Sequence, residues 1–160
     1  MKKAVLFGVM ALLSSVSLTF ADSAKLGEKQ IAVNHAQAEK NKELVLKAYQ
    51  ELLGDHDITA LDRYWSEDYI QHNPHQADGR KDLKEALTRI GIFSMPKNKI
   101  EVVRAIAEGD LVFMETHQKP PGSPDLVLAD IFRVKDNMIV EHWDVIQSVP
   151  ADATNPRPMY

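Results

Sequence analysis

The spacing of apolar residues changes from a helical period to a strand period at Pro96, and this change limits the fold class more than any other feature of the sequence. Before Pro96, apolar residues recur four positions apart, as in Leu44, Ala48 and Leu52. After it, four segments alternate apolar and polar residues between turn sequences: 99–107, 111–118, 126–134 and 138–148. Helices followed by a run of antiparallel strands predict an α+β fold, with the helices packed on one face of a curved sheet.

Three helices and one further strand are expected ahead of these four strands. The first helix covers 28–53 and ends at Gly54, and a short second helix, capped by Asp57, buries Trp65. The segment SEDYIQHN then has the composition of a strand that Pro74 ends. The third helix is expected from Lys81 to Ile92, with an apolar stripe along one side: Leu83, Ala86, Leu87 and Ile90.

The first residues have the pattern of a secretory signal peptide. Two lysines precede an apolar run from Ala4 to Leu13, and small residues lead to Ala21, where we expect cleavage; Ala24 is the alternative. The apolar run is shorter than a membrane span needs. The expected parts are therefore a signal peptide at 1–21, one domain at 22–150 and an irregular tail at 151–160, in a soluble protein of the bacterial periplasm.

Charge and cysteine content exclude several kinds of partner. The chain carries 19 basic and 23 acidic residues and has no cluster of lysine or arginine, so nucleic acid and anionic membranes are poor partners. It has no cysteine, which excludes a cysteine nucleophile and means that the fold does not depend on disulfides. A small molecule is the expected ligand.

The turn between the last two strands decides which polar side chains share a face, because a shift of one residue exchanges the two faces. A two-residue loop at Asp136 and Asn137 needs positive φ at both residues, whereas a three-residue loop needs it only at Asn137. The three-residue loop is therefore favoured, and it pairs Val134 with Met138. One face of the hairpin then carries the polar residues Asp130, His142 and Asp144, with Asp130 opposite His142. The apolar residue Phe132 lies on the same face. The two-residue loop would place Glu141 and Trp143 there instead.

Candidate pocket residues on the other strands follow from alternation. His117 lies on the same face of its strand as Glu115. If His117 faces the pocket, Glu115 is therefore expected to face it too. On the first strand, Ile70 is the expected core residue and carries His72 inward. Two aromatic residues, Trp65 and Tyr69, are expected in the core and, secondarily, in the pocket wall.

Three motifs resemble the SnoaL-like branch of the NTF2-like superfamily: DYIQHNPHQADGR at 68–80, METHQ at 114–118 and DIFRVKDNMIVEHWDV at 130–145. The resemblance implies a cone-shaped α+β barrel with a cofactor-free pocket, often dimeric through the outer face of its sheet. Polyketide cyclases of this type close a ring by an intramolecular aldol condensation, with an aspartate as acid and base and a histidine that assists. By motif position these match Asp130 and His117. Those cyclases are cytoplasmic, so the export signal is a departure from the pattern.

The leading hypothesis is thus a cofactor-independent aldol or cyclase-type enzyme for a small, largely apolar carbonyl compound, with Asp130 as base and His117 as the partner of the oxyanion. The competing hypothesis is a module that binds a small ligand in the same pocket without turnover. Metal binding is a weaker reading, because the candidate ligands His72, His75, His117 and His142 lack tight local spacing. No metal and no cofactor are therefore predicted.

Overall fold

The computed structural model describes the backbone of residues 6–160 and the side chains of residues 22–160. It divides into two units, Met1–Gln37 and Ala38–Tyr160. The helix α1 (Leu6–Tyr49) begins in the first unit, where every described side chain is exposed. The expected signal peptide at 1–21 falls partly on residues 1–5, which lie outside the described residues, so it stays a prediction. Within the described part of the chain, no helix is both long enough and apolar enough to cross a membrane.

The second unit opens with the helical segments, which agree with those expected from the sequence. The last part of α1 continues into one π-helical turn, which ends at Gly54, the residue expected to stop the helix. The segments that follow are α2 (Ala60–Tyr64), α3 (Arg80–Arg89) and the short 3-10 helix η2 (Ile92–Ser94), with the π-helical turn itself, η1, at Gln50–Gly54. Trp65 was expected in the second helix, but it begins a strand.

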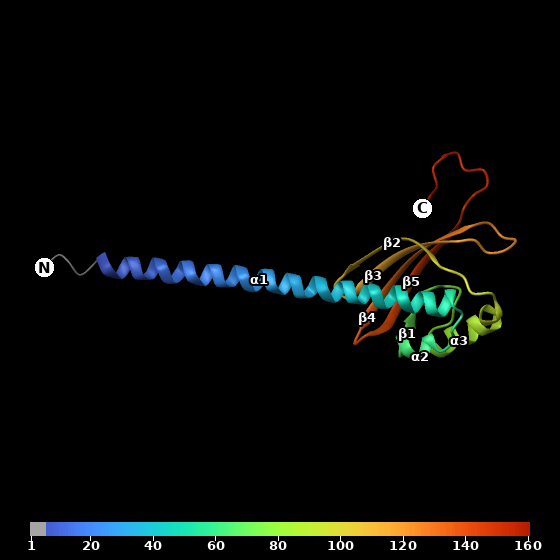
Figure 1. Ribbon diagram of the computed structural model, residues 1–160, viewed down its shortest axis with the longest axis horizontal. Helices are drawn as coiled ribbons and strands as arrows, with labels where there is room; N and C mark the ends of the chain where they lie inside the picture. The colour runs from blue at the N-terminus through green and yellow to red at the C-terminus, as the bar shows by residue number, and fades with distance from the viewer. Residues whose placement is uncertain (1–5) are drawn as a thin grey trace. The chain divides into compact units, whose positions relative to one another are not determined.

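Five strands form one open, mixed sheet in the order β1-β5-β4-β3-β2 (Figure 1). The strands are β1 (Trp65–Gln71), β2 (Glu101–Glu108), β3 (Leu111–Gln118), β4 (Leu126–Lys135) and β5 (Met138–Ser148). Strand β1 runs parallel to β5, and all other neighbours are antiparallel. The predicted α+β class and the mainly antiparallel sheet are confirmed, although the sheet does not close into a barrel.

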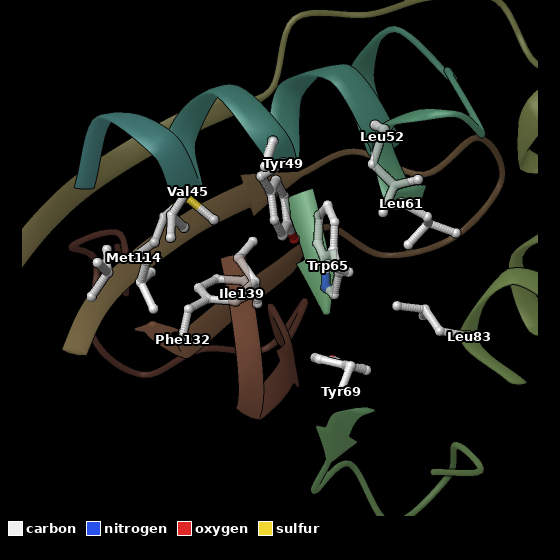
Figure 2. Close-up of a cluster of buried hydrophobic side chains, with 14 of the residues drawn as sticks. Val45, Tyr49, Leu52, Leu61, Trp65, Tyr69, Leu83, Met114, Phe132 and Ile139 are labelled. Carbon is white, nitrogen blue, oxygen red and sulfur yellow. The ribbon is translucent and has the colours of Figure 1, made fainter. Parts of the chain in front are cut away.

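The hydrophobic core lies between the helices and one face of the sheet, which we call the inner face. Figure 2 shows Val45 and Tyr49 projecting from α1 toward Phe132 and Ile139 of the sheet, and Leu52 of η1 belongs to the same buried cluster. These side chains are at most 5% exposed. Because apolar side chains at i, i+4 and i+7 lie along one side of a helix, α1 can cover several strands at once.

The final hairpin differs from the favoured prediction in its pairing but not in its faces. The loop has two residues, and both Asp136 and Asn137 have positive φ, at 50° and 61°. Arg133 then pairs with Glu141 but Val134 pairs with Ile139, so Val140 is an extra residue in β5. This bulge offsets the one-residue shift of the shorter loop. As a result Asp130 pairs with Asp144 rather than with His142, yet all three remain on one face.

Candidate active site

A pocket of about 120 Å³ opens at the inner face of the sheet, between β1, β4, β5 and the helices. Its apolar wall consists of aliphatic side chains: Leu52, Leu53, Leu83, Leu87, Leu128 and Ile146. Four aromatic residues add to it: Tyr49, Trp65, Tyr69 and Phe132. The polar lining residues are Gln71, Gln76, Asp130, His142 and Asp144. A mostly apolar cavity with a few grouped polar side chains has the composition of a small-molecule site.

Asp130 is the most deeply buried acid in this lining. Its side chain is 2% exposed, and its Oδ1 lies 3.0 Å from Nε2 of His142. Burial raises the pKa of Asp130 above its ordinary value of 3.8, and the hydrogen bond and charge of His142 act in the opposite direction. The second oxygen, Oδ2, has no hydrogen-bond partner among the described residues. Asp130 therefore combines a paired oxygen with an unpaired one.

The hydrogen bonds of Gln71 show which ring nitrogen of His142 carries a proton. The amide oxygen of Gln71 accepts a hydrogen bond from the backbone N–H of Asn73 at 3.0 Å, and its nitrogen donates to the Tyr69 hydroxyl at 3.0 Å. The bond from the Asn73 N–H fixes which end of the amide is the oxygen, because a backbone N–H can only donate. That oxygen lies 3.1 Å from Nδ1 of His142, so Nδ1 must carry a proton and donate it.

It follows that Nε2 of neutral His142 presents a lone pair to Asp130. The contact between Nε2 and Oδ1 is then a hydrogen bond only if one proton lies between them, either on the carboxyl of Asp130 or on the imidazole. The raised pKa of Asp130 favours the first arrangement. Asp130 and His142 thus form a pair that can exchange one proton inside an apolar pocket.

Asp144 is held by a second fixed amide. The side-chain oxygen of Asn73 accepts a hydrogen bond from the backbone N–H of His75 at 2.8 Å, so its nitrogen faces Asp144. That nitrogen lies 2.8 and 2.7 Å from the two carboxylate oxygens of Asp144. The charge of Asp144 adds to the rise in the pKa of Asp130. The last residue of β1, Gln71, and Asn73 just after the strand thus supply two amides that position the polar groups of β5.

Two of the expected pocket residues lie on the other side of the sheet. Register pairs Met114, and not Glu115 or His117, with Asp130, so these two residues project from the outer face. The ring of His117 is buried there, within 3.0 Å of carboxylate oxygens of Glu101 and Asp125. The prediction that His117 and Asp130 face one cavity is wrong. Both faces of β3 carry apolar residues, so alternation could not distinguish them.

The prediction that His72 faces the pocket is also wrong. Tyr69 is the buried residue of β1, at 2% exposed, whereas Ile70 is 44% exposed. This parity turns Gln71 inward and His72 outward. Outside, the His72 ring stacks on Trp143 with centroids 4.8 Å apart, and its Nε2 lies 2.9 Å from Glu141. Gln71 and Asn73 were not predicted as pocket residues for the same reason, because the parity of this strand was assigned from Ile70.

The other predicted pocket residues lie around the cavity: Trp65, Tyr69, Asp130, Phe132, His142 and Asp144. The same group contains the residues with suitable ligand atoms for a cation. One donor atom from each of Asp130, His142 and Asp144 lies within 4.8 Å of the others. This is a different set from the histidines considered in the sequence, because His72 and His117 point to the outer face. Both oxygens of Asp144 already accept hydrogen bonds from Asn73.

Several solved structures have a fold similar to that of this chain. The chain is similar to an NTF2-like protein of unknown function from Burkholderia xenovorans LB400, with 21% identity, a TM-score of 0.57 and coverage of 72% of this chain and 89% of that chain. It is also similar to a proposed polyketide cyclase from Acidithiobacillus ferrooxidans, with 20% identity, a TM-score of 0.55 and coverage of 67% and 87%. A proposed ketosteroid isomerase from Kribbella flavida DSM 17836 gives 19% identity, a TM-score of 0.57 and coverage of 76% and 84%.

At these identities the three likenesses show the fold, a cone-shaped α+β arrangement, and nothing further. No curated protein matches the chain significantly. The family model described as a SnoaL-like domain matches residues 46–142, which run from the end of α1 into the last strand, β5. The chain therefore belongs to the SnoaL-like family, as the three sequence motifs indicated.

Proposed function

We propose that this protein catalyses proton transfer on a small, largely apolar carbonyl compound without a cofactor, in a reaction of the aldol or cyclase kind. The observation that carries the proposal is the carboxyl group of Asp130. It is buried in an apolar pocket, shares a proton with His142 through Oδ1 and leaves Oδ2 without a partner among the described residues. A carboxylate in an apolar wall is a stronger base than one in water, which removal of a C–H proton next to a carbonyl requires.

In the proposed reaction, each proton moves between two defined atoms. Oδ2 of Asp130 removes a proton from the carbon next to the substrate carbonyl, and the electron pair of that C–H bond forms an enolate. The enolate carbon then attacks a second carbonyl of the same molecule, which forms a C–C bond and an alkoxide. The proton on Oδ2 passes to the alkoxide, so Asp130 is regenerated and the product is an isomer of the substrate. As Oδ2 takes up the substrate proton, the proton shared with His142 moves from Oδ1 to Nε2, and it returns when Oδ2 gives its proton to the alkoxide, so the carboxyl group never carries two protons.

The alternative is a protein that binds such a compound without turnover. It is supported by the same pocket, since an aspartate, a histidine and two fixed amides can also orient a bound hydroxyl or carbonyl group. The two functions differ in what Asp130→Asn does. Asparagine keeps the size of the side chain and can donate a hydrogen bond to Nε2 of His142, but it cannot accept a substrate proton.

The test is a cyclisation assay with small dicarbonyl compounds, in which ring-closed product is separated by chromatography. We expect Asp130→Asn to lower kcat by at least about 100-fold, the contribution typical of a positioned base. Asp68→Asn is the matched control, because Asp68 is exposed on the same sheet and outside the pocket. Equal product formation by the wild type and Asp130→Asn would contradict the proposal, and binding without product would favour the alternative.

Two further parts of the proposal concern the whole chain. We propose that residues 1–21 direct it to the periplasm, on the basis of the N-terminal sequence pattern.

We also propose a homodimer formed through the outer face of the sheet. Exposed apolar side chains on that face support it: Ile106, Ile131 and Val145.

A further inference from the structure

The pocket wall contains a buried hydrogen-bond donor that has no acceptor among the described residues. Trp65 is 2% exposed, and its indole Nε1 has no hydrogen-bond partner among the described residues. Buried tryptophan N–H groups usually have a partner, because a buried donor without one has lost its hydrogen bond to water and gained none in return. Because Trp65 lines the pocket, a ligand bound there can supply the missing acceptor.

A second donor lies beside it. The hydroxyl oxygen of Tyr69 accepts a hydrogen bond from Nε2 of Gln71 at 3.0 Å, so the hydrogen of that hydroxyl remains available to another acceptor. Burial raises the pKa of Tyr69, which keeps the hydroxyl protonated, and the effect of Trp65 on this pKa is in the opposite direction. Trp65 and Tyr69 both line the pocket. Figure 2 shows the two side chains on the same side of the core.

The charges around the pocket are of one sign. None of the described lining residues is a lysine or an arginine, whereas Asp130 and Asp144 are both present. An anionic ligand would lose its hydration in this apolar wall and find no positive side chain in return. The indole N–H of Trp65 and the hydroxyl of Tyr69 are therefore suited to bind an uncharged oxygen atom.

We propose that Trp65 Nε1 and the Tyr69 hydroxyl together hold the carbonyl oxygen of an uncharged substrate, such as a keto ester or a diketone, and that the pocket rejects the corresponding carboxylates. The inference rests on the proposed function, because it names the groups that take up the charge of the enolate oxygen. It gives to strand β1 the role in holding the oxyanion that the sequence-based hypothesis gave to His117. Two neutral donors aimed at that oxygen become stronger partners as it gains charge, which lowers the barrier to proton removal.

The tryptophan content of the chain allows a direct test. Trp65 and Trp143 are the two tryptophans, and Trp143 lies on the outer face. In the variant Trp143→Phe, the indole N–H signal in a ¹H–¹⁵N NMR spectrum belongs to Trp65 alone. The probes are ethyl acetoacetate, which is neutral, and acetoacetate, its anionic relative.

We expect the ester to move the Trp65 N–H signal saturably, in the direction of a stronger hydrogen bond, and acetoacetate at equal concentration to leave it in place. Tyr69→Phe should weaken binding of the ester about 2- to 10-fold, the effect of one neutral hydrogen bond. Tyr64→Phe is its control, because the Tyr64 hydroxyl bonds Glu51 outside the pocket. Equal binding of acetoacetate, failure of the ester to bind, or binding that shifts other pocket signals and not Trp65 would each overturn the inference.

The outcomes separate this inference from the proposed function. Binding that moves the Trp65 signal without any proton transfer that depends on Asp130 overturns the proposed function but leaves the oxygen site. Proton transfer that depends on Asp130, with an unmoved Trp65 signal, overturns the oxygen site alone. The Trp65 shift should persist in Asp130→Asn, because the variant changes the base and not the donors.

Discussion

Two opposing effects act on the carboxyl group of Asp130. Burial raises its pKa, and the hydrogen bond and charge of His142 lower it, with burial the larger effect. Groups perturbed in this way gather at functional sites, because a base must hold a proton more tightly than water-exposed carboxylates do. The same perturbation has a consequence for stability that can be measured without knowing the substrate.

We predict that Asp130→Asn stabilises the protein at neutral pH. The folded chain binds the Asp130 proton more tightly than the unfolded chain does, so between the unfolded and folded pKa values the stability of the wild type falls as pH rises. Each unit of this difference costs about 1.4 kcal/mol above the folded pKa. Asparagine carries no charge and escapes this cost.

Urea denaturation at pH 7 and below the ordinary aspartate pKa of 3.8 measures the effect. The gain in the free energy of unfolding for Asp130→Asn should be present at pH 7 and shrink toward the lower pH. Asp68→Asn should show no such gain. A variant that loses the same stability at both pH values would indicate that Asp130 is a structural residue.

Gln71 is predicted to act through His142, as a positioning residue. Gln71→Leu removes the acceptor from Nδ1, so the neutral ring can also adopt the tautomer with its proton on Nε2. We expect the cyclisation rate to fall about tenfold, as for other residues that orient a functional histidine. Gln71→Glu keeps an acceptor oxygen and should restore the tautomer. The ¹⁵N shifts of the His142 ring report it, and identical shifts in the wild type and Gln71→Leu would refute the assignment.

At the scale of the elements, periodicity predicted the helices and strands well but not the parity of two strands. The alternation of β4 and the final hairpin placed Asp130, His142 and Asp144 on one face, even though the loop was a residue shorter than expected. The bulge at Val140 restored the parity, and no local sequence signal marks it. On β1 and β3, apolar residues occupy both faces, so the direction of His72 and His117 depends on the tertiary packing of their neighbours.

Gly54 gives a prediction at the end of the π-helical turn. A Cβ there would lie 2.7 Å from the backbone oxygen of Asn98 and 2.1 Å from Nε2 of Gln50. The Gln50 amide holds the segment before β2, since it donates to the Asn98 oxygen and accepts from the N–H of Ile100. We expect Gly54→Ala to cost about 1–3 kcal/mol, because a backbone atom must move.

The matched control is Gly27→Ala, at an exposed position of α1 where a Cβ meets nothing within 4 Å. Alanine is the better helix former, so this change should leave stability unchanged or raise it by up to about 1 kcal/mol. Thermal unfolding of both variants measures the difference. Equal melting temperatures for the two would contradict the close approach at Gly54.

For the whole molecule, we expect the outer face of the sheet to pair two copies of the chain. Val145 is 70% exposed there, and Val145→Lys places a charge at the expected contact. Sedimentation velocity should show a dimer for the wild type and a monomer for this variant. Ile90→Lys is the control, because Ile90 is 62% exposed next to α3 and away from that face. A monomeric wild type, or a dimer that Val145→Lys does not weaken, would contradict the expectation.

The pocket as a whole is proposed to remove a proton from a carbon next to a carbonyl, and deuterium exchange of cyclohexanone in D₂O measures that step by itself. We predict that the wild type accelerates exchange above the buffer rate, increasingly as pH rises through the pKa of Asp130. Asp130→Asn should return exchange to the buffer rate, and Asp68→Asn should not. Exchange that is equally fast with the wild type and Asp130→Asn would show that Asp130 is not the base.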